Sequence, residues 1–327
     1  MVSFTRLRHG TALGNALMIL TLTLNTAIDH ILHIPALKLG ETIRSSKSYL
    51  AMGGKGTDAS YILGTLGIAN IAMGFKAGIF GAKMESMLRA RHVIPDFVEV
   101  DGETRVSTLI IEDGGGQSTF TTDTLEISSL QIDELIERFD THLKQVGCVI
   151  FGGTPPQGLP QEVFVDLIRR TRVRSIPVVL DASGPALKAG VAAGPTIIKP
   201  NLRELEQLTG RELPTFDDIL RATRSIMEAH GCSVLATLGE DGALAIVGEK
   251  AYRINPLHNE VKNTAGAGDA ILAGLAYALD NSYPIEEGLR LGFAAAAAVM
   301  MTPQTAECNP QDVERLKSQV ELTPIPL

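Results

Sequence analysis

The sequence contains few cysteines, only Cys148, Cys232 and Cys308. Their number is odd, they lie far apart, and no two of them have the CxxC spacing of metal and redox sites. This pattern argues against a disulfide framework and against a zinc site. We expect three buried free thiols in a reducing compartment, and therefore a cytoplasmic protein.

The sequence also contains fewer basic than acidic residues. The 327 residues include 29 Lys and Arg against 37 Asp and Glu, which gives a formal net charge of -8 at pH 7. This balance argues against nucleic acid or an anionic membrane as the main partner. It is compatible with a small anionic substrate, because a local pocket can be basic on an acidic protein.

Long apolar runs are missing as well, since no segment reaches the roughly 20 apolar residues that a membrane-spanning helix requires. Arg6 and Arg8 precede the apolar run 16–24, an arrangement that resembles a weak signal peptide. The run is rich in threonine, however, and no clean cleavage site of small residues follows it. We therefore interpret 1–17 as a disordered leader and 18–327 as the folded domain.

Short apolar runs alternate with longer helical patterns along most of the folded domain. This alternation predicts βαβ units and an α/β fold, with a mostly parallel central sheet covered by helices on both faces. The predicted strands are Met18–Leu24, Ala69–Gly74, Cys148–Phe151, Pro177–Leu180, Thr196–Ile198 and Ser233–Thr237. The predicted helices are Thr57–Leu66, Ala82–Arg91, Ser128–Gln145, Gln161–Thr171, Leu202–Thr209, Thr215–Ala229, Ala267–Leu279, Pro284–Met300 and Asn309–Val320.

Two segments, 31–52 and 104–122, depart from this alternation because they look like strands without helices between them. The second contains Glu112-Asp113-Gly114-Gly115-Gly116, which is typical of a hairpin turn. Their mixed polarity does not suit central strands of a buried sheet. We predict a small antiparallel sheet that projects from the core and acts as a lid. Two surface hairpins without a function are the alternative.

The motif with the most chemical information is Asn263-Thr264-Ala265-Gly266-Ala267-Gly268-Asp269, which leads into a helical pattern. Glycines before a helix let backbone N–H groups turn towards an anion, and the helix N-terminus adds positive partial charge. An Asp in the first turn can accept a hydroxyl proton beside a phosphoryl group held by those amides. The alternative is a glycine-rich turn in which Asp269 only caps the helix.

A second glycine-rich motif, Gly53-Gly54-Lys55-Gly56-Thr57-Asp58, also leads into a helix. Its glycines permit close approach of a substrate, Lys55 offers charge, and Asp58 can bind hydroxyl groups. The spacing is not that of a P-loop, because a glycine follows Lys55. A strand-to-helix turn with a solvated Lys55 is the alternative interpretation.

Two further loops follow predicted strands. In Lys199-Pro200-Asn201-Leu202-Arg203-Glu204, the side chains of Asn201 and Glu204 can share one side of the first helical turn. Such oxygen ligands suit Mg²⁺, often through water, although a capping box explains the same pair. The loop that begins Thr237-Leu238-Gly239 could offer a hydroxyl and amides to phosphate, or could be only a hairpin turn.

Asp29 and Arg105 complete the candidate residues. Asp29 lies shortly after the first predicted strand and could bind sugar hydroxyls, and Arg105 opens the second lid segment, where its guanidinium could grip a phosphate. Asp29, Asn201 and Thr237 all follow the carboxyl ends of predicted parallel strands. An open α/β sheet binds its ligands at that edge, so we expect these residues to lie together.

Taken together, these motifs resemble those of the ribokinase-like, or phosphofructokinase-B, carbohydrate kinases. The resemblance covers nearly all of the chain from Met18 onward, and the matching segments occur in the family's order: 25–29, 53–58, 104–105, 199–205, 237–242 and 263–269. It is greatest for the branch that phosphorylates sugar phosphates, with 1-phosphofructokinase, tagatose-6-phosphate kinase and the minor 6-phosphofructokinase. It implies a three-layer α/β/α fold, a small β lid and, in many members, a homodimer formed through that lid.

The resemblance also implies a role for each matching residue. For catalysis the implied residues are Asp269 as the base and, as the anion hole, Gly266, Ala267 and Gly268. For the substrate they are Asp29, Gly54, Lys55 and Asp58 at the sugar, and Arg105 and Arg44 at the phosphate that the substrate already carries. For ATP and Mg²⁺ they are Lys199, Asn201, Thr237 and Gly239 at the phosphates, and Glu204, with Asn201 through water, at the metal ion.

Three positions depart from the family pattern. Thr26 replaces a usual Pro, Asp58 replaces a usual Asn, and Gly153 stands where a Ser often meets the substrate phosphate, although Thr154 follows it. A carboxylate near an anionic sugar phosphate repels it unless it binds only hydroxyls. These changes affect the choice of sugar rather than phosphoryl transfer.

We therefore predict an ATP-dependent kinase that phosphorylates a hydroxyl of a sugar phosphate, such as fructose 1-phosphate, fructose 6-phosphate or tagatose 6-phosphate. A kinase of an unphosphorylated sugar or a nucleoside is the nearest alternative. A non-catalytic sugar-binding regulator with the same fold is a further one.

Overall fold

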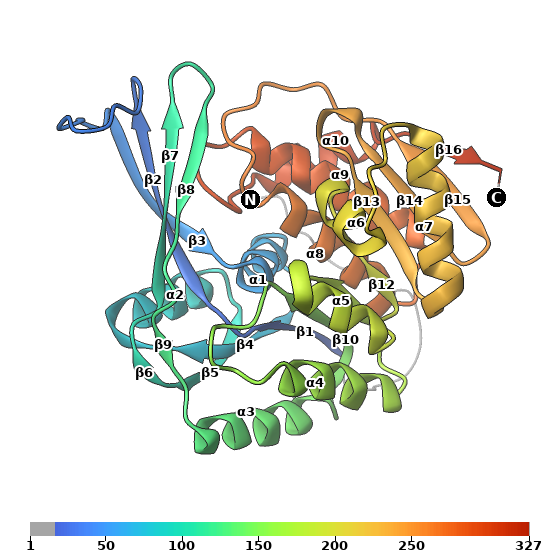
Figure 1. The fold of residues 1–327 in the computed structure, drawn as a ribbon, viewed down its shortest axis with the longest axis horizontal. Helices are drawn as coiled ribbons and strands as arrows, with labels where there is room; N and C mark the ends of the chain where they lie inside the picture. The colour runs from blue at the N-terminus through green and yellow to red at the C-terminus, as the bar shows by residue number, and fades with distance from the viewer. Residues whose placement is uncertain (1–16, 327) are drawn as a thin grey trace.

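The computed structural model describes residues 17–326 of the chain, so the predicted leader, apart from Leu17, lies outside the described residues. A ten-stranded sheet forms the centre of the molecule, with seven parallel strands from β13 to β5 and three antiparallel strands at the other edge (Figure 1). Its strands lie in the order β16 (Leu322–Ile325), β15 (Lys250–Ile254), β14 (Ala243–Val247), β13 (Ser233–Thr237), β12 (Ile197–Ile198), β11 (Val178–Asp181), β10 (Val146–Gly152), β1 (Met18–Thr23), β4 (Asn70–Lys76) and β5 (Ile94–Glu99).

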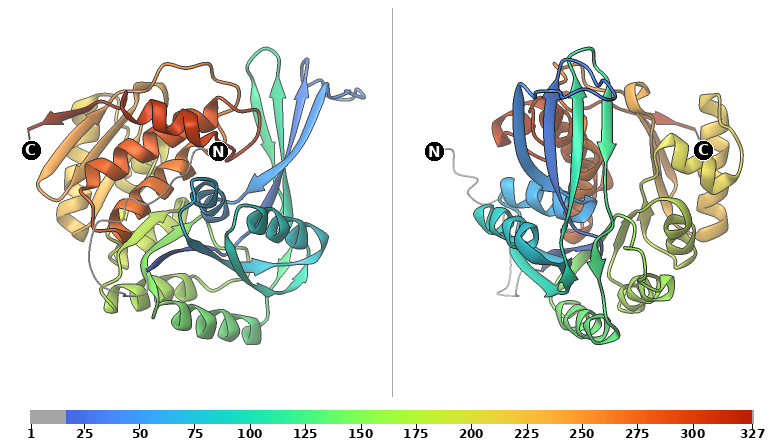
Figure 2. Two further views of the ribbon diagram at one scale, coloured as in Figure 1. Left: turned by 180° about the vertical axis from the view of Figure 1, so that it is seen from behind. Right: turned by 60° about the vertical axis from the view of Figure 1, so that its left-hand side comes forward.

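Helices cover both faces of this sheet, because its parallel strands are apolar on both sides. One face packs against α1 (Lys55–Thr65), α2 (Gly78–Ala90), α8 (Ala267–Asp280), α9 (Ile285–Met300) and α10 (Pro310–Lys317). The other packs against α3 (Ser129–His142), α4 (Gln161–Val173), α5 (Gly184–Ala192), α6 (Leu202–Thr209) and α7 (Phe216–His230). The predicted three-layer arrangement is therefore confirmed (Figures 1 and 2).

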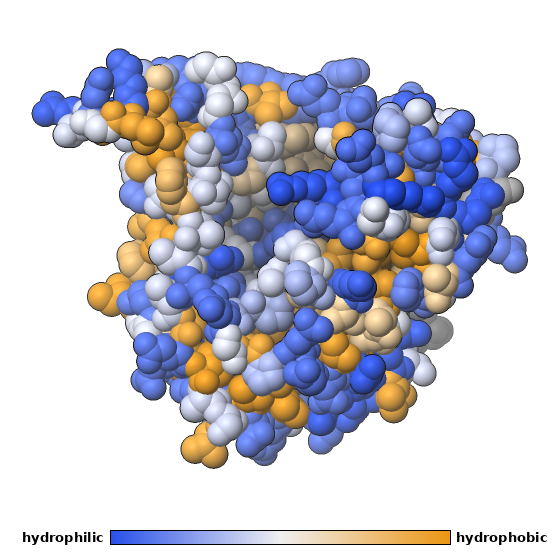
Figure 3. Space-filling model, in the orientation of Figure 1, coloured by the Kyte–Doolittle hydropathy of each residue, from blue (hydrophilic) through white to orange (hydrophobic). Residues whose placement is uncertain are grey.

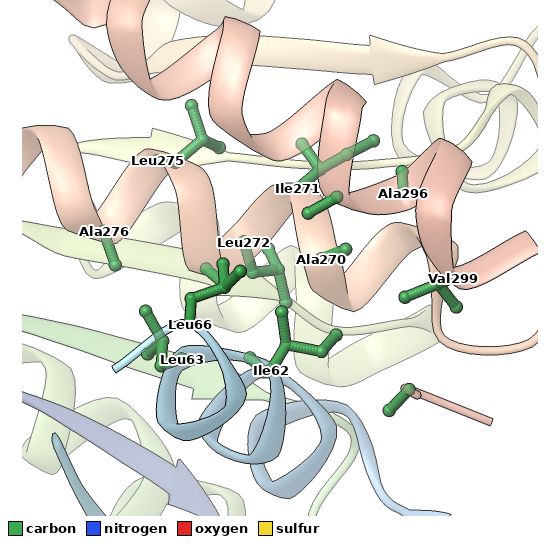
Figure 4. Packing of buried hydrophobic residues seen from close by; sticks show 14 of the residues in the cluster. Ile62, Leu63, Leu66, Ala270, Ile271, Leu272, Leu275, Ala276, Ala296 and Val299 are labelled. Carbon is green, nitrogen blue, oxygen red and sulfur yellow. The ribbon is translucent and has the colours of Figure 1, made fainter. Parts of the chain in front are cut away.

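The packing of α1 against α8 brings the two glycine-rich motifs together. The buried side chains of Ile62 and Leu63 in α1, and of Leu66 directly after it, face Leu272 of α8 (Figure 4). Both helices begin at a glycine-rich loop, so this apolar contact places their N-termini at the same edge of the sheet.

All three cysteines are free and buried, as predicted.

A four-stranded sheet stands away from the main body (Figure 1), and its strands lie in the order β3 (Lys47–Gly53), β2 (Ala27–Ile34), β7 (Arg105–Glu112) and β8 (Gln117–Phe120). We call it the small sheet. Its two outer pairings are antiparallel, whereas the central pair, β2 with β7, is parallel. The predicted turn joins β7 to β8, with the amide of Glu112 donating to the carbonyl of Gly116 at 2.8 Å. A two-stranded ribbon, β6 (Asp101–Gly102) with β9 (Leu125–Glu126), lies at its base.

Within residues 17–326, the helices are all too short or too polar to cross a membrane.

Candidate active site

Loops from the carboxyl ends of the parallel strands meet the N-termini of α1 and α8 beside the small sheet. The surface is hollowed between the small sheet and the main body on this side (Figure 3). Asp181 ends β11, Lys199 follows β12, and Asn201 bridges to Thr237 at the end of β13. The predicted convergence of motifs at this edge of the sheet is therefore what the structure shows.

The N-terminus of α8 forms a tight backbone turn around Gly266. This residue has φ of 85°, and a Cβ atom there would lie 2.6 Å from the backbone nitrogen of Ala306, so only glycine fits. The Gly266 carbonyl accepts hydrogen bonds from the amides of Asp269 and Ala270, at 3.1 and 3.0 Å. The amide of Gly268 has no acceptor among the residues that the structure describes. It is thus free to bind an anion.

Asp181 joins the two lysines of the predicted site, and it is the main residue that the sequence patterns did not single out. Its Oδ2 lies 2.7 Å from the Nζ of Lys199, and its Oδ1 accepts a hydrogen bond from the Nζ of Lys55. Although burial alone would raise the pKa of Asp181, the two ammonium groups hold it below its ordinary value. The Nζ of Lys55 also lies 3.7 Å from the Oε1 of Glu204.

Three buried carboxyl groups, Asp29, Asp58 and Asp269, lie close to one another, and Asp269 also faces the two lysines. Burial raises the pKa of Asp269 to about 7, and Asp181 adds to this rise while Lys55 and Lys199 oppose it. Burial likewise raises the pKa of Asp58 well above its ordinary value, with Asp269 and Asp29 as further causes. The Oδ1 atom of Asp58 has no hydrogen-bond partner among the described residues. Such unpaired buried atoms favour a ligand-binding role.

Asp29 belongs to β2 rather than to the loop after β1, because β2 begins at Ala27. Its Oδ2 accepts a hydrogen bond of 2.9 Å from the hydroxyl of Thr305. Burial raises the pKa of Asp29 to about 6, and the hydrogen bond from Thr305 and the charge of Arg105 lower it. Asp29 also lies against the motif of α1, since a Cβ atom on Gly53 would come within 2.5 Å of its Oδ1.

The two predicted phosphate-binding arginines lie in different places. Arg105, at the start of β7, pairs in register with Ala27 and donates to the hydroxyl of Thr121 at 2.9 Å. Burial lowers its pKa, against the charges of Asp123 and Asp29. Arg44, in contrast, lies in the exposed loop between β2 and β3, at the far end of the small sheet from α1 (Figure 1). The structure therefore brings Arg105 into the cluster but not Arg44.

Asn201, Glu204 and Gly239 lie in the segments that follow β12 and β13. Asn201 and Glu204 form a capping box: the Asn201 side chain accepts from the Glu204 amide at 2.8 Å, and the Glu204 Oε2 accepts from the Asn201 amide at 2.9 Å. The Oε1 of Glu204 is not used by this cap and faces Lys55. Gly239 begins a short 3₁₀ turn between β13 and β14, with φ of 63°.

Among residues 17–326, no three His, Cys, Asp or Glu side chains are grouped to hold a metal ion on their own. The carboxylate best placed to meet one is Glu204 through its Oε1, because both oxygens of Asp181 already accept from lysines. A Mg²⁺ ion commonly takes one or two carboxylates together with phosphate oxygens and water. The residues present therefore fit a metal ion that arrives with a phosphate ligand.

Comparisons with known proteins identify the family of the chain. The profile of the pfkB family carbohydrate kinases matches residues 22–312. A 1-phosphofructokinase from Bacillus subtilis (strain 168) is 28% identical over 306 residues, which cover 94% of this chain and 99% of that protein. A tagatose-6-phosphate kinase from Staphylococcus epidermidis is 30% identical over 313 residues, covering 93% and 99%.

Solved structures of similar fold also include kinases of this kind. The tetrameric inhibited form of phosphofructokinase-2 from Escherichia coli superposes with a TM-score of 0.83 at 26% identity, covering 93% of this chain and 99% of that one. The predicted ribokinase-like fold and the predicted family are both confirmed. The chain belongs to the pfkB family of carbohydrate kinases and is a phosphotransferase.

Proposed function

We propose that the protein transfers the γ-phosphoryl group of ATP to a hydroxyl of a sugar phosphate. The observation that carries the proposal is the position of Asp269: it lies buried in the first turn of α8, beside a free amide and two lysines joined by Asp181. The relatives support the substrate class, since they include kinases of fructose and tagatose phosphates.

Asp269 acts as the base in this proposal. Its carboxylate takes the proton of the attacking hydroxyl while the oxygen forms a bond to the γ-phosphorus and the bond from that phosphorus to ADP breaks. The backbone of Gly266, Ala267 and Gly268 stabilises the charge that develops on the phosphoryl oxygens. A pKa of about 7 suits a group that must accept and release a proton near neutral pH.

The substrate lies between the small sheet and α1. Asp29 and Asp58 bind its hydroxyl groups, Gly54 and Lys55 provide a close backbone approach and charge, and Arg105 binds its phosphate. The unpaired Nε of Arg105 and Oδ1 of Asp58 support these roles, because each buried atom requires a partner that the described protein atoms do not supply.

The nucleotide lies on the other side of the cluster. We assign its phosphates to the residues that follow β12 and β13, which are Lys199, Asn201, Thr237 and Gly239. Bound Mg²⁺ supplies charge neutralisation of the phosphates, and Glu204 is the residue of this chain that holds it. Binding of ATP releases Lys199 in part from Asp181, because the phosphates compete for the same ammonium group.

The small sheet acts as a lid and as a dimer contact in this proposal. Its inner face carries Asp29. Ile31 and Leu109 on that face pack with Ala265 in the glycine-rich segment before α8. Its outer face carries Leu50 and Phe120, which are 46% and 55% exposed. Closure of such a lid excludes water and thereby suppresses ATP hydrolysis.

We place the protein in the cytoplasm, in keeping with its three free thiols.

The decisive experiment replaces Asp269 by Asn and measures ADP release with ATP, Mg²⁺ and a panel of fructose 1-phosphate, fructose 6-phosphate and tagatose 6-phosphate. We expect kcat to fall at least about a hundredfold, because the general base is lost. Asp280→Asn is the matched control: it makes the same chemical change at the opposite end of the same helix, and its kcat should stay at the parent level. Near-native turnover by Asp269→Asn would rule out the assigned base.

A second candidate function is phosphorylation of a neutral sugar or nucleoside. It is favoured by Asp58, which adds a carboxyl group to the substrate side and would repel a phosphate placed next to it. Arg105→Ala separates the two functions. For a sugar phosphate, we expect KM to rise by tenfold or more with KM for ATP unchanged, since a charged hydrogen bond is worth about 1.5–3 kcal/mol. An unchanged KM for the substrate that turns over fastest would favour the neutral substrate.

A further inference from the structure

The connection between α9 and α10, residues 302–308, contacts both halves of the proposed site although none of the sequence motifs includes it. The hydroxyl of Thr305 donates to Asp29, which is proposed to bind the sugar. The backbone of the next residue, Ala306, lies directly against Gly266, the first residue of the proposed anion hole. Thr305 is 2% exposed, so water does not compete for its hydroxyl.

This connection is held in one conformation by contacts outside the site. Glu307 receives hydrogen bonds of 2.7 and 2.9 Å from the Arg91 guanidinium and one of 2.9 Å from the Tyr61 hydroxyl. Arg91 also lies over the Tyr61 ring, 5.0 Å from its centroid. At the other end, the hydroxyl of Thr302 bonds within the connection to the carbonyl oxygens of Gln304 and Glu307. Such a fixed segment can orient a neighbouring side chain accurately.

We propose that Thr305 is a positioning residue for the sugar: its hydroxyl orients the Asp29 carboxylate and keeps it in the form that accepts hydrogen bonds from sugar hydroxyls. This inference rests on the proposed function, in which Asp29 binds the sugar. The charged groups that face Asp29 are Arg105 from β7, Asp58 from α1 and Asp269 from α8. Two of these three are carboxyl groups, which favour protonation of Asp29, so the donor from Thr305 opposes them.

Two matched variants test the role of the hydroxyl. Thr305→Val keeps the shape of the side chain and removes the donor, whereas Thr305→Ser keeps the donor and removes a methyl group. With Val we expect kcat/KM for the sugar phosphate to fall about tenfold at pH 6 and much less at pH 8. Loss of the donor raises the pKa of Asp29, so more of this carboxyl group is protonated at pH 6 while most of it stays ionised at pH 8. KM for ATP should not change, and Ser should restore the parent pH profile.

A second readout does not depend on turnover. In protein labelled with ¹³C at the aspartate carboxyl carbons, the Asp29 signal, assigned with Asp29→Asn, should titrate at higher pH in Thr305→Val than in the parent and in Thr305→Ser. An unmoved Asp29 titration in Thr305→Val, or equal losses with Val and Ser, would overturn the proposal. If no sugar phosphate is turned over, the proposed function fails while the titration still decides the role of Thr305. Should Thr305→Val not fold, Thr305→Ala replaces it with the same expected direction.

Discussion

At the scale of single residues, the site is a group of carboxyl and ammonium groups that are buried together. Lys55 and Lys199 share Asp181, while Asp29, Asp58 and Asp269 carry raised pKa values. Because these carboxyl groups influence one another, the enzyme should show one acid limb that belongs to the group as a whole rather than to one residue. Burial thus raises the pKa values of these carboxyl groups in a way that suits the proposed function. It also lowers the stability of the fold while no ligand is bound.

Asp280 permits a test of that stability effect away from the site. It is the last residue of α8, and burial raises its pKa to about 6 against the lowering effect of the Gly147 amide. The ordinary value is 3.8, so the folded state favours the protonated form. Its contribution to stability is therefore fully present below about pH 4 and is lost as pH rises through 6.

We expect Asp280→Asn to raise the free energy of unfolding by about 1 kcal/mol at pH 8, after allowance for solvent screening, and to have little effect at pH 4. Urea unfolding at the two pH values, with ellipticity as the signal, measures the difference. A gain of the same size at both pH values would mean that hydrogen bonding, and not the charge, is responsible.

The residues that sequence patterns identified differ in kind from those that they missed. Asp269 and Lys55 lie in the first turns of helices that follow glycine-rich segments, where a local pattern reveals them. Asp181 could have been suspected, because it directly follows a predicted strand, but nothing local marks it as the partner of two lysines. Thr305 lies in an irregular connection and meets Asp29 across 276 positions of the sequence, so only the tertiary structure reveals it.

At the scale of elements, the contact between α8 and α9 depends on glycine. A Cβ atom on Gly274 would lie 2.4 Å from the backbone nitrogen of Gly292, and one on Gly288 would lie 2.8 Å from the carbonyl oxygen of Gly274. The two helix backbones therefore approach each other directly. This close contact holds α8, and with it Asp269, at a fixed depth against the sheet.

Gly274→Ala should lower the free energy of unfolding by about 1–3 kcal/mol, because the added methyl group separates the two helices or strains them. Thermal unfolding followed by circular dichroism measures the change. Gly114→Ala is the control, since a Cβ atom at Gly114 meets nothing within 4 Å. Equal Tm values for the two variants would show that α8 and α9 can move apart without cost.

The sequence patterns missed α5 and β5, and each omission has a physical reason. The pattern around α5 contains Gly184-Pro185 at its start, and most of its apolar residues are small, yet Pro185 occupies the first helical turn and the helix packs on β11. β5 contains Pro95 and charged residues, which suit only the edge of a sheet, where it lies. Strongly periodic segments such as α6 were predicted with their exact ends, because the capping box marks the start and Gly210 the end.

At the scale of the whole molecule, we expect the outer face of the small sheet to contact a second copy of the chain. Leu50, His30, Thr108 and Phe120 lie in one row across its four strands, so Leu50 and Phe120 share the same face. Exposed large apolar side chains such as these two are suited to a contact surface. The four strands would become covered if two lids pack face to face.

We expect the parent protein to be a dimer by light scattering after gel filtration, and the double variant Leu50→Glu with Phe120→Glu to be a monomer, because two charges on each face repel across the contact. Leu130→Glu, which changes an exposed leucine of α3, controls for added charge and should remain dimeric. A monomeric parent, or a double variant that stays dimeric, would move the contact elsewhere.

The three buried cysteines give the molecule internal reporters of its own opening. Cys148 lies in β10 at the centre of the large sheet, whereas Cys308 lies in the connection that contacts Asp29 and Gly266. A thiol reagent can react with either one only after the structure around it opens. The labelling rates of Cys148 and Cys308 therefore separate global unfolding from local opening at the proposed active site, and a bound substrate should slow the labelling of Cys308 far more than that of Cys148.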